Sequence, residues 1–241
     1  VASDTGLHDL RLVMTPDDVA WLHDAPNLMS NDRFGATVVY RGAEVFYDVG
    51  VRLKGSERGR PTTSRLGYGL SFGRDQPFRG SHTSVMIDRS EGVGYGQREV
   101  LLNILMTRAG SVSGEHNDVV HLASPLPQHA GAAELQLDRF SSLVLDAQFD
   151  DGAEGTRWEY ELLYYPLTTN TGAVDGLKLP QPDSVVGTPI TDLGDDSEAY
   201  RWVWLMKNRE RFDDYGPVQE LGRVFALPAP QFRAEVDSVI D

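Results

Sequence analysis

Short runs of alternating apolar residues determine the architecture of the first 137 residues. Apolar side chains at every second position form one face of a half-buried β-strand, and β-branched or aromatic runs also favour strands. Such runs recur at residues 8–14, 36–40, 45–53, 68–72, 84–88, 118–122 and 132–137. Arg41-Gly42 marks a tight turn, so the runs on either side of it predict a β-hairpin.

Helical signals are fewer in this part of the chain. Thr15 is the expected N-cap of a short helix that begins at Pro16 and extends to Leu22. Residues 97–109 contain strong helix formers and are followed by Gly110, and their apolar residues nearly encircle the helix axis. This pattern predicts a buried helix.

Helices become more frequent after residue 137. We expect them at 139–148, 195–208, 217–225 and from 230 onwards, with a strand at 158–165. The whole pattern predicts an α+β fold, in which a mixed, mainly antiparallel sheet packs on a buried helix and is followed by helices.

The length and the composition limit the domain organisation. A chain of 241 residues with 40% hydrophobic residues has enough material for one large domain or two small ones. We predict a single region, with a sheet-rich lobe at 1–137 and a helix-rich portion at 138–241. Residues 166–190 are rich in Pro, Gly and Thr with little periodicity, which predicts a long irregular loop.

Charge is distributed unevenly along the sequence. The chain carries a formal net charge of -14, but residues 51–80 have a net charge of +5, because they hold seven basic and only two acidic residues. The basic residues of this island are Arg52, Lys54, Arg58, Arg60, Arg65, Arg74 and Arg79. An acidic chain is unsuited to general nucleic-acid binding, so the island favours a bound anion.

Several classes of site are excluded by the sequence. The chain has no cysteine, which removes disulfides, zinc–thiolate sites and cysteine nucleophiles. No run approaches the roughly 20 apolar residues of a membrane span. Phosphate-binding loops, nucleophile elbows and histidines at metal-binding spacing are also missing, so the metal ligands are unknown.

Arg52 and Lys54 are two positions apart in a predicted strand, so their side chains project from the same face. Gly55 and Ser56 follow in a turn whose backbone N–H groups can also face an anion. The group suits a phosphate or a nucleotide; alternatively, the two cations form the solvated face of an amphipathic hairpin. Lysine is rare here, with three residues in the chain, and its compact charge favours a phosphate role for Lys54.

Glu99 lies in the first turn of the predicted helix at 97–109. If this helix faces the sheet that carries Lys54, the two side chains form the Lys–Glu pair that fixes the lysine in kinase nucleotide sites. The alternative is that Glu99 only complements the positive end of the helix dipole.

The order of these motifs resembles the spore-coat CotH kinase family. The runs that carry the resemblance are Asp-Val-Gly-Val-Arg-Leu-Lys-Gly-Ser at 48–56, Gln-Pro-Phe-Arg-Gly at 76–80, Ile87-Asp88, and Arg98-Glu99 at the head of a helix that ends in Ala109-Gly110. The runs at 161–166 and 176–182 resemble a bacterial branch of the family. The resemblance covers most of the chain, with the motifs in the same order.

This resemblance implies an atypical, secretory-type protein kinase, a transferase that uses ATP with Mg or Mn. Its substrate would be Ser of secreted or coat proteins, and its location extracellular or on the cell surface. Lys54 and Glu99 would be the catalytic residues. The nucleotide would be bound by Arg52, Lys54, Gly55, Ser56 and Arg65.

The sequence departs from the family at its end. The family's later Asp followed by Asn, and its Trp-Asp-x-Asp motif, do not occur before Asp241. We therefore expect the chain to be the N-terminal part of a longer domain, completed by further sequence or by a complementary chain, and inactive by itself. The alternative is a non-catalytic extracellular binding or scaffold module whose basic loop binds an anion.

Overall fold

The computed structural model describes residues 6–28, 30–55, 60, 63–89, 97–109, 117–137, 145–146, 149–160, 164–168, 174–178, 190–201 and 203–240. The chain divides into two compact units. The first consists of Val1–Gly152 with Thr168–Asp175, and the second of Ala153–Leu167 with Gly176–Asp241.

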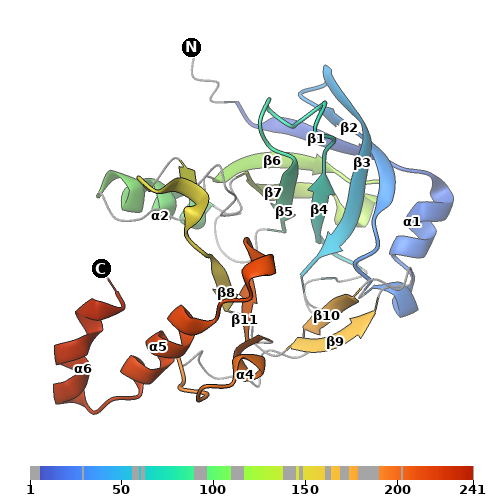
Figure 1. Cartoon of the computed structure of the whole chain (residues 1–241). Helices are drawn as coiled ribbons and strands as arrows, with labels where there is room; N and C mark the ends of the chain where they lie inside the picture. The colour runs from blue at the N-terminus through green and yellow to red at the C-terminus, as the bar shows by residue number, and fades with distance from the viewer. Residues whose placement is uncertain are drawn as a thin grey trace. The chain divides into compact units, whose positions relative to one another are not determined.

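A closed β-barrel forms the first unit (Figure 1). Its strands are β1 (His8–Val13), β2 (Phe34–Tyr40), β3 (Glu44–Lys54), β4 (Gly67–Ser71), β5 (Ser84–Asp88), β6 (Asn117–Ala123) and β7 (Gly131–Gln136). They are hydrogen-bonded in the order β1-β2-β3-β4-β5-β7-β6, and parallel pairing of β6 with β1 closes the barrel. The other neighbours pair antiparallel.

Strand alternation explains the core of the barrel. Every second residue points inward, so the interior is filled with aliphatic and tyrosine side chains that are almost completely buried. They include Leu10, Leu12, Val38, Tyr40, Val49, Val51, Leu53, Tyr68, Leu70, Val85, Ile87, Val120, Leu122 and Leu135. Residues between them, such as Arg52 and Lys54 on β3, face outward.

Local signals in the first unit are confirmed. Helix α1 spans Pro16–Leu22, and the Thr15 hydroxyl accepts a hydrogen bond from the Asp18 backbone N–H at 3.2 Å. In the β2–β3 turn, Arg41 and Gly42 both have positive φ, as a tight hairpin turn requires. Two 3-10 turns, η1 (Ala25–Asn27) and η3 (Pro127–His129), follow α1 and β6.

The predicted packing of the sheet on a buried helix is wrong. Helix α2 forms at Gln97–Arg108, within the predicted range, but none of its residues is buried. Leu101, Leu102 and Leu105 are each more than half exposed. The physical reason is that the sheet closes on itself and buries its apolar face inside the barrel, so that face is not available to cover a helix.

The second unit combines short strands and helices. Strands β8 (Trp158–Tyr160) and β11 (Trp204–Met206) pair antiparallel, and the helices are α4 (Ser197–Arg201), α5 (Gly216–Phe225) and α6 (Ala229–Glu235). Tyr200, Tyr215 and Val218 form its buried cluster. The 3-10 turns are η4 (Gly152–Glu154), η6 (Glu210–Phe212) and η7 (Val236–Ser238).

Predictions for this half of the chain were less accurate. The helix expected at 195–208 ends at Arg201, and β11 follows it, because a short apolar run such as 202–206 suits either structure. The strand expected at 158–165 is two strands, β8 and β9 (Tyr164–Thr168), and β9 pairs with β10 (Val174–Lys178) inside the expected loop.

Other predictions for this half are confirmed in part or lie outside the described residues. Helix α5 is confirmed, and α6 begins as expected but ends at Glu235. Most of the helix expected at 139–148 and residues 179–189 of the expected loop lie outside the described residues. Within those residues, no helix has both the length and the apolar character needed to cross a membrane.

Candidate functional site

Lys54 lies at the end of β3, on the outer face of the barrel, and forms an ion pair with Asp88 at the end of β5. Both side chains remain accessible to solvent, with 27% of Lys54 and 30% of Asp88 exposed. Strand β4 lies between the two strands, and its Gly67 is the residue directly opposite Lys54. The lysine therefore reaches its partner across a position that has no side chain.

Arg52 occupies the previous outward position of β3. Its Nη1 group donates hydrogen bonds to the Asn31 side-chain oxygen at 2.9 Å and to the Leu53 carbonyl at 3.2 Å. The residue opposite Arg52 on β4 is again a glycine, Gly69. The prediction that Arg52 and Lys54 share one face is confirmed, because both residues alternate along β3 with the buried Val51 and Leu53.

Gly55 follows Lys54 with a φ of +96°, a left-handed conformation that favours glycine. Its carbonyl accepts a hydrogen bond at 2.8 Å from Nε of Arg60, which is only 4% exposed. The Arg60 guanidinium also donates to the carbonyls of Leu28 and Ser30, at 2.6 and 2.9 Å. A buried cation thus ties the turn after β3 to the segment that precedes β2.

Sequence reasoning missed this structural role of Arg60. The residue looked like its basic neighbours, since nothing in the spacing distinguishes an arginine that binds backbone carbonyls from one that faces solvent. Its burial alone separates the two cases.

Arg65 and Glu99, two of the remaining predicted site residues, take no part in the Lys54–Asp88 ion pair. Arg65 donates a hydrogen bond to the Ala132 carbonyl of β7, so it anchors the loop to the barrel. Glu99 is exposed on α2 and makes no ion pair with any described residue. Ser56 lies outside the described residues. The structure therefore brings Lys54 to Asp88 and not to Glu99.

A second carboxylate lies beside Asp88. Glu134 on β7 is the cross-strand neighbour of Asp88, on the same outer face, and it is only 3% exposed. Glu134 was missed because only the β5–β7 register places it next to Asp88.

Two stacked histidines connect the end of α1 with η3. The rings of His23, which caps α1, and His129, in η3, are 4.7 Å apart between centroids with an interplanar angle of 16°. His129 Nδ1 donates a 2.6 Å hydrogen bond to the Ser64 carbonyl. Burial, and secondly the charge of His129, lower the pKa of His23 to about 4. His23 is therefore neutral at pH 7.

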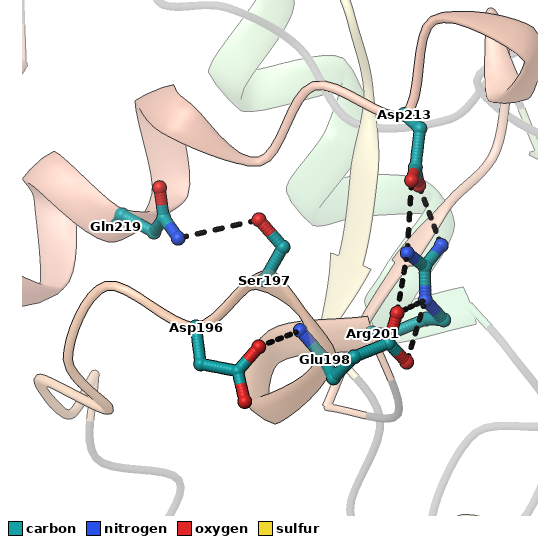
Figure 2. Close-up of polar contacts among 6 residues, drawn as sticks. All are labelled: Asp196, Ser197, Glu198, Arg201, Asp213 and Gln219. Carbon is teal, nitrogen blue, oxygen red and sulfur yellow. Dashed lines mark hydrogen bonds and ion pairs between the residues drawn. The ribbon is translucent and has the colours of Figure 1, made fainter.

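The second unit contains an arginine network that is structural in character (Figure 2). Arg201 on α4 binds Asp213 through two hydrogen bonds of 2.5 and 2.9 Å, and it also binds Glu198 one turn earlier. The Asp213 hydrogen bond is the main cause of the raised pKa of Arg201, and Arg201 in turn lowers the pKa of Asp213. The network holds α4 against the turn before α5.

A divalent metal has no identified ligands here. Among the described residues, no three histidine or carboxylate side chains are grouped closely enough to hold a metal ion. Mg or Mn binding therefore stays a prediction from the family resemblance.

Comparisons with known proteins do not assign the chain to a family. No protein-family model matches the sequence, and no curated protein matches it significantly.

Proposed function

We propose that this chain is part of a CotH-like atypical protein kinase, in which Lys54 and Arg52 bind the phosphates of ATP complexed with Mg or Mn. One observation carries the proposal: two cations project from adjacent outward positions of β3, next to two glycine positions of β4. A partly exposed lysine paired with a carboxylate is the arrangement by which kinases place a cation at the nucleotide phosphates.

The chemistry of the two cations suits a polyphosphate. A lysine ammonium acts as a compact point charge, whereas an arginine guanidinium offers several donors in a plane. Hydrogen bonds from either group to phosphate oxygens are charge-assisted and stronger than neutral ones. The backbone turn at Gly55 follows directly, and its left-handed conformation is of the kind that contributes N–H groups to anion sites.

Transfer of the phosphoryl group needs more than these residues. A kinase stabilises the transferring group with metal ions held by acidic residues, and the motifs that supply those acids in the family do not occur in this sequence. We propose that further sequence or a complementary chain supplies them. The complete enzyme would phosphorylate Ser of secreted or coat proteins, outside the cell or at its surface.

Calorimetric titration of the chain with ATP tests the proposal, in the presence of Mg²⁺, Mn²⁺ or a chelator. We expect metal-dependent binding that Lys54→Ala weakens at least about tenfold, because it removes a charge-assisted contact. Lys207→Ala is the matched control, since Lys207 is also a partly exposed lysine in a carboxylate ion pair, with Glu159 at 2.8 Å. Equal affinity of the two variants for ATP would refute the site.

The same titration separates the kinase proposal from the non-catalytic alternative. A binding module with an anion-binding loop would bind a sulfated glycan such as heparin in a manner that depends on Lys54, and would not bind ATP under any metal condition.

A further inference from the structure

We propose that Asp88 is a positioning residue, which holds the Lys54 ammonium where it can bind the nucleotide phosphates. Gly67 has no side chain and therefore lets the Lys54 side chain cross β4 to reach Asp88. This inference rests on the proposed function, because it concerns the same site. It replaces the predicted role of Glu99 with a residue of the barrel itself.

The pair spans two strand spacings. Strands β3 and β5 are separated by β4, and neighbouring strands lie about 4.8 Å apart, so the two backbones are about 10 Å apart. An extended lysine side chain and a short aspartate can cover this distance only if the lysine lies flat across β4. The length of lysine and the shortness of aspartate therefore match their places on the sheet.

Gly67 makes that path available. A Cβ atom placed on Gly67 would lie 3.2 Å from Cβ and 3.4 Å from Cδ of Lys54, so the lysine stem occupies the space that a side chain would need. The same Cβ would lie 2.7 Å from the Ile87 carbonyl, closer than real Cβ atoms approach. A glycine at this position is thus required both by the strand packing and by the route of Lys54.

The barrel core fixes both ends of the pair. The residue before Lys54 is Leu53 and the residue before Asp88 is Ile87, and both are fully buried in the core. Because strand residues alternate between faces, the burial of these two residues aims the two charged side chains outward. A binding group whose support is packed on rigid strands is held more accurately than one on a loop.

The ion pair also links two strands of the barrel wall, because Lys54 lies on β3 and Asp88 on β5. Substitution of Lys54 therefore disturbs the contact between these strands as well as the site. Substitution of Asp88 tests the positioning role more cleanly.

The test uses the full chain labelled with ¹⁵N-lysine and three variants. Asp88→Asn removes the carboxylate charge with little change of shape, and Asp88→Glu restores the charge. Glu159→Gln is the matched control, because it removes the carboxylate partner of Lys207. The chain has three lysines, so the ammonium signal of Lys54 can be followed by NMR while calorimetry measures the affinity for Mg·ATP.

We expect Asp88→Asn to weaken Mg·ATP binding about tenfold and to broaden the Lys54 ammonium signal, because the ammonium loses its fixed partner. Asp88→Glu should recover most of both effects, and Glu159→Gln should change neither. If Asp88 has only a structural role, Asp88→Asn should lower the unfolding temperature without a selective loss of the Lys54 ammonium signal. In that case Asp88→Glu should not restore Mg·ATP binding.

Two failures are distinguishable. If the unaltered chain binds Mg·ATP and Asp88→Asn binds it equally well, Asp88 does not position Lys54, although the proposed function stands. If the unaltered chain does not bind Mg·ATP, the proposed function fails and the positioning role falls with it.

Discussion

The stacked pair of His23 and His129 should make the barrel sensitive to acid. His23 is neutral at pH 7 in the fold, and the buried ring nitrogens His23 Nδ1 and His129 Nε2 have no hydrogen-bond partner among the described residues. A proton on His23 would place a charge in a largely desolvated site, next to a second imidazole at 4.7 Å. The perturbation is acidification from pH 7 to pH 4.

The magnitude follows from the pKa of His23, which burial and His129 lower from 6.5 to about 4. The unfolded chain takes up this proton before the folded chain does, so the stabilisation is complete above pH 6.5 and is lost as the pH falls towards 4. A shift of this size corresponds to about 3.4 kcal/mol at most. Because His23 keeps some contact with water, we expect about 1–2 kcal/mol.

Urea unfolding at a series of pH values measures this loss. His23→Phe keeps a flat ring against His129 but cannot take up a proton, so its stability should fall less between pH 6.5 and 4 than that of the unaltered chain. His121→Gln, which removes a half-exposed histidine of β6, is the control and should retain the full fall. Identical pH profiles for His23→Phe and the unaltered chain would refute the lowered pKa of His23.

Two further substitutions test the barrel and its loop. Arg60→Ala removes the buried guanidinium that binds three backbone carbonyls, so we expect it to lower the free energy of unfolding by about 2–4 kcal/mol. The control Arg74→Ala removes an exposed arginine and should have little effect. If urea unfolding shows only a small change for both variants, the structural role of Arg60 is contradicted. Gly67→Ala should lower the free energy of unfolding by about 1–3 kcal/mol, because the added Cβ clashes with the Ile87 carbonyl. The control Gly35→Ala places a Cβ that meets nothing within 4 Å and should be far less destabilising. Equal thermal unfolding temperatures of the two variants would show that β4 can shift to accommodate the added methyl group.

The sequence predicts the strands of the barrel well because their signal is local. Alternation of apolar residues marks β1, a short apolar run marks β5, and the N-cap at Thr15 locates α1. Closure of the barrel depends on the parallel pairing of β1 with β6, whose paired residues are all more than a hundred positions apart in the sequence. An open sheet and a closed one have the same alternation, so the pattern cannot distinguish them.

The failed prediction for α2 has the same origin. A helix with apolar residues all round is normally buried, and an open sheet would have offered a face to cover it. Closure buries that face inside the barrel, and Leu101, Leu102 and Leu105 remain exposed as a consequence. The error about the helix was therefore an error about long-range strand pairing.

The candidate site was predictable in part for a related reason. Period-two geometry places Arg52 and Lys54 on one face from the sequence alone. The partner of Lys54 could not be found in this way, because Asp88 reaches it only through the β3–β4–β5 register and the glycine between them. The positive charge of Lys54 predicts an acidic partner, but only the strand order and register of the sheet identify that partner as Asp88.

The contacts of the basic island at residues 51–80 show that several of its cations have structural partners. Arg60 and Arg65 bind backbone carbonyls, and Arg79 binds Asp118 at 2.7 Å, so much of the +5 charge has a structural use. Lys54 itself lies beside the carboxylate of Asp88. A bare polyphosphate that approaches Lys54 would meet negative charge as well as positive. A nucleotide whose phosphates are already partly neutralised by a divalent cation is better suited to this surface, which agrees with the metal complex of ATP that the family resemblance suggests as the ligand.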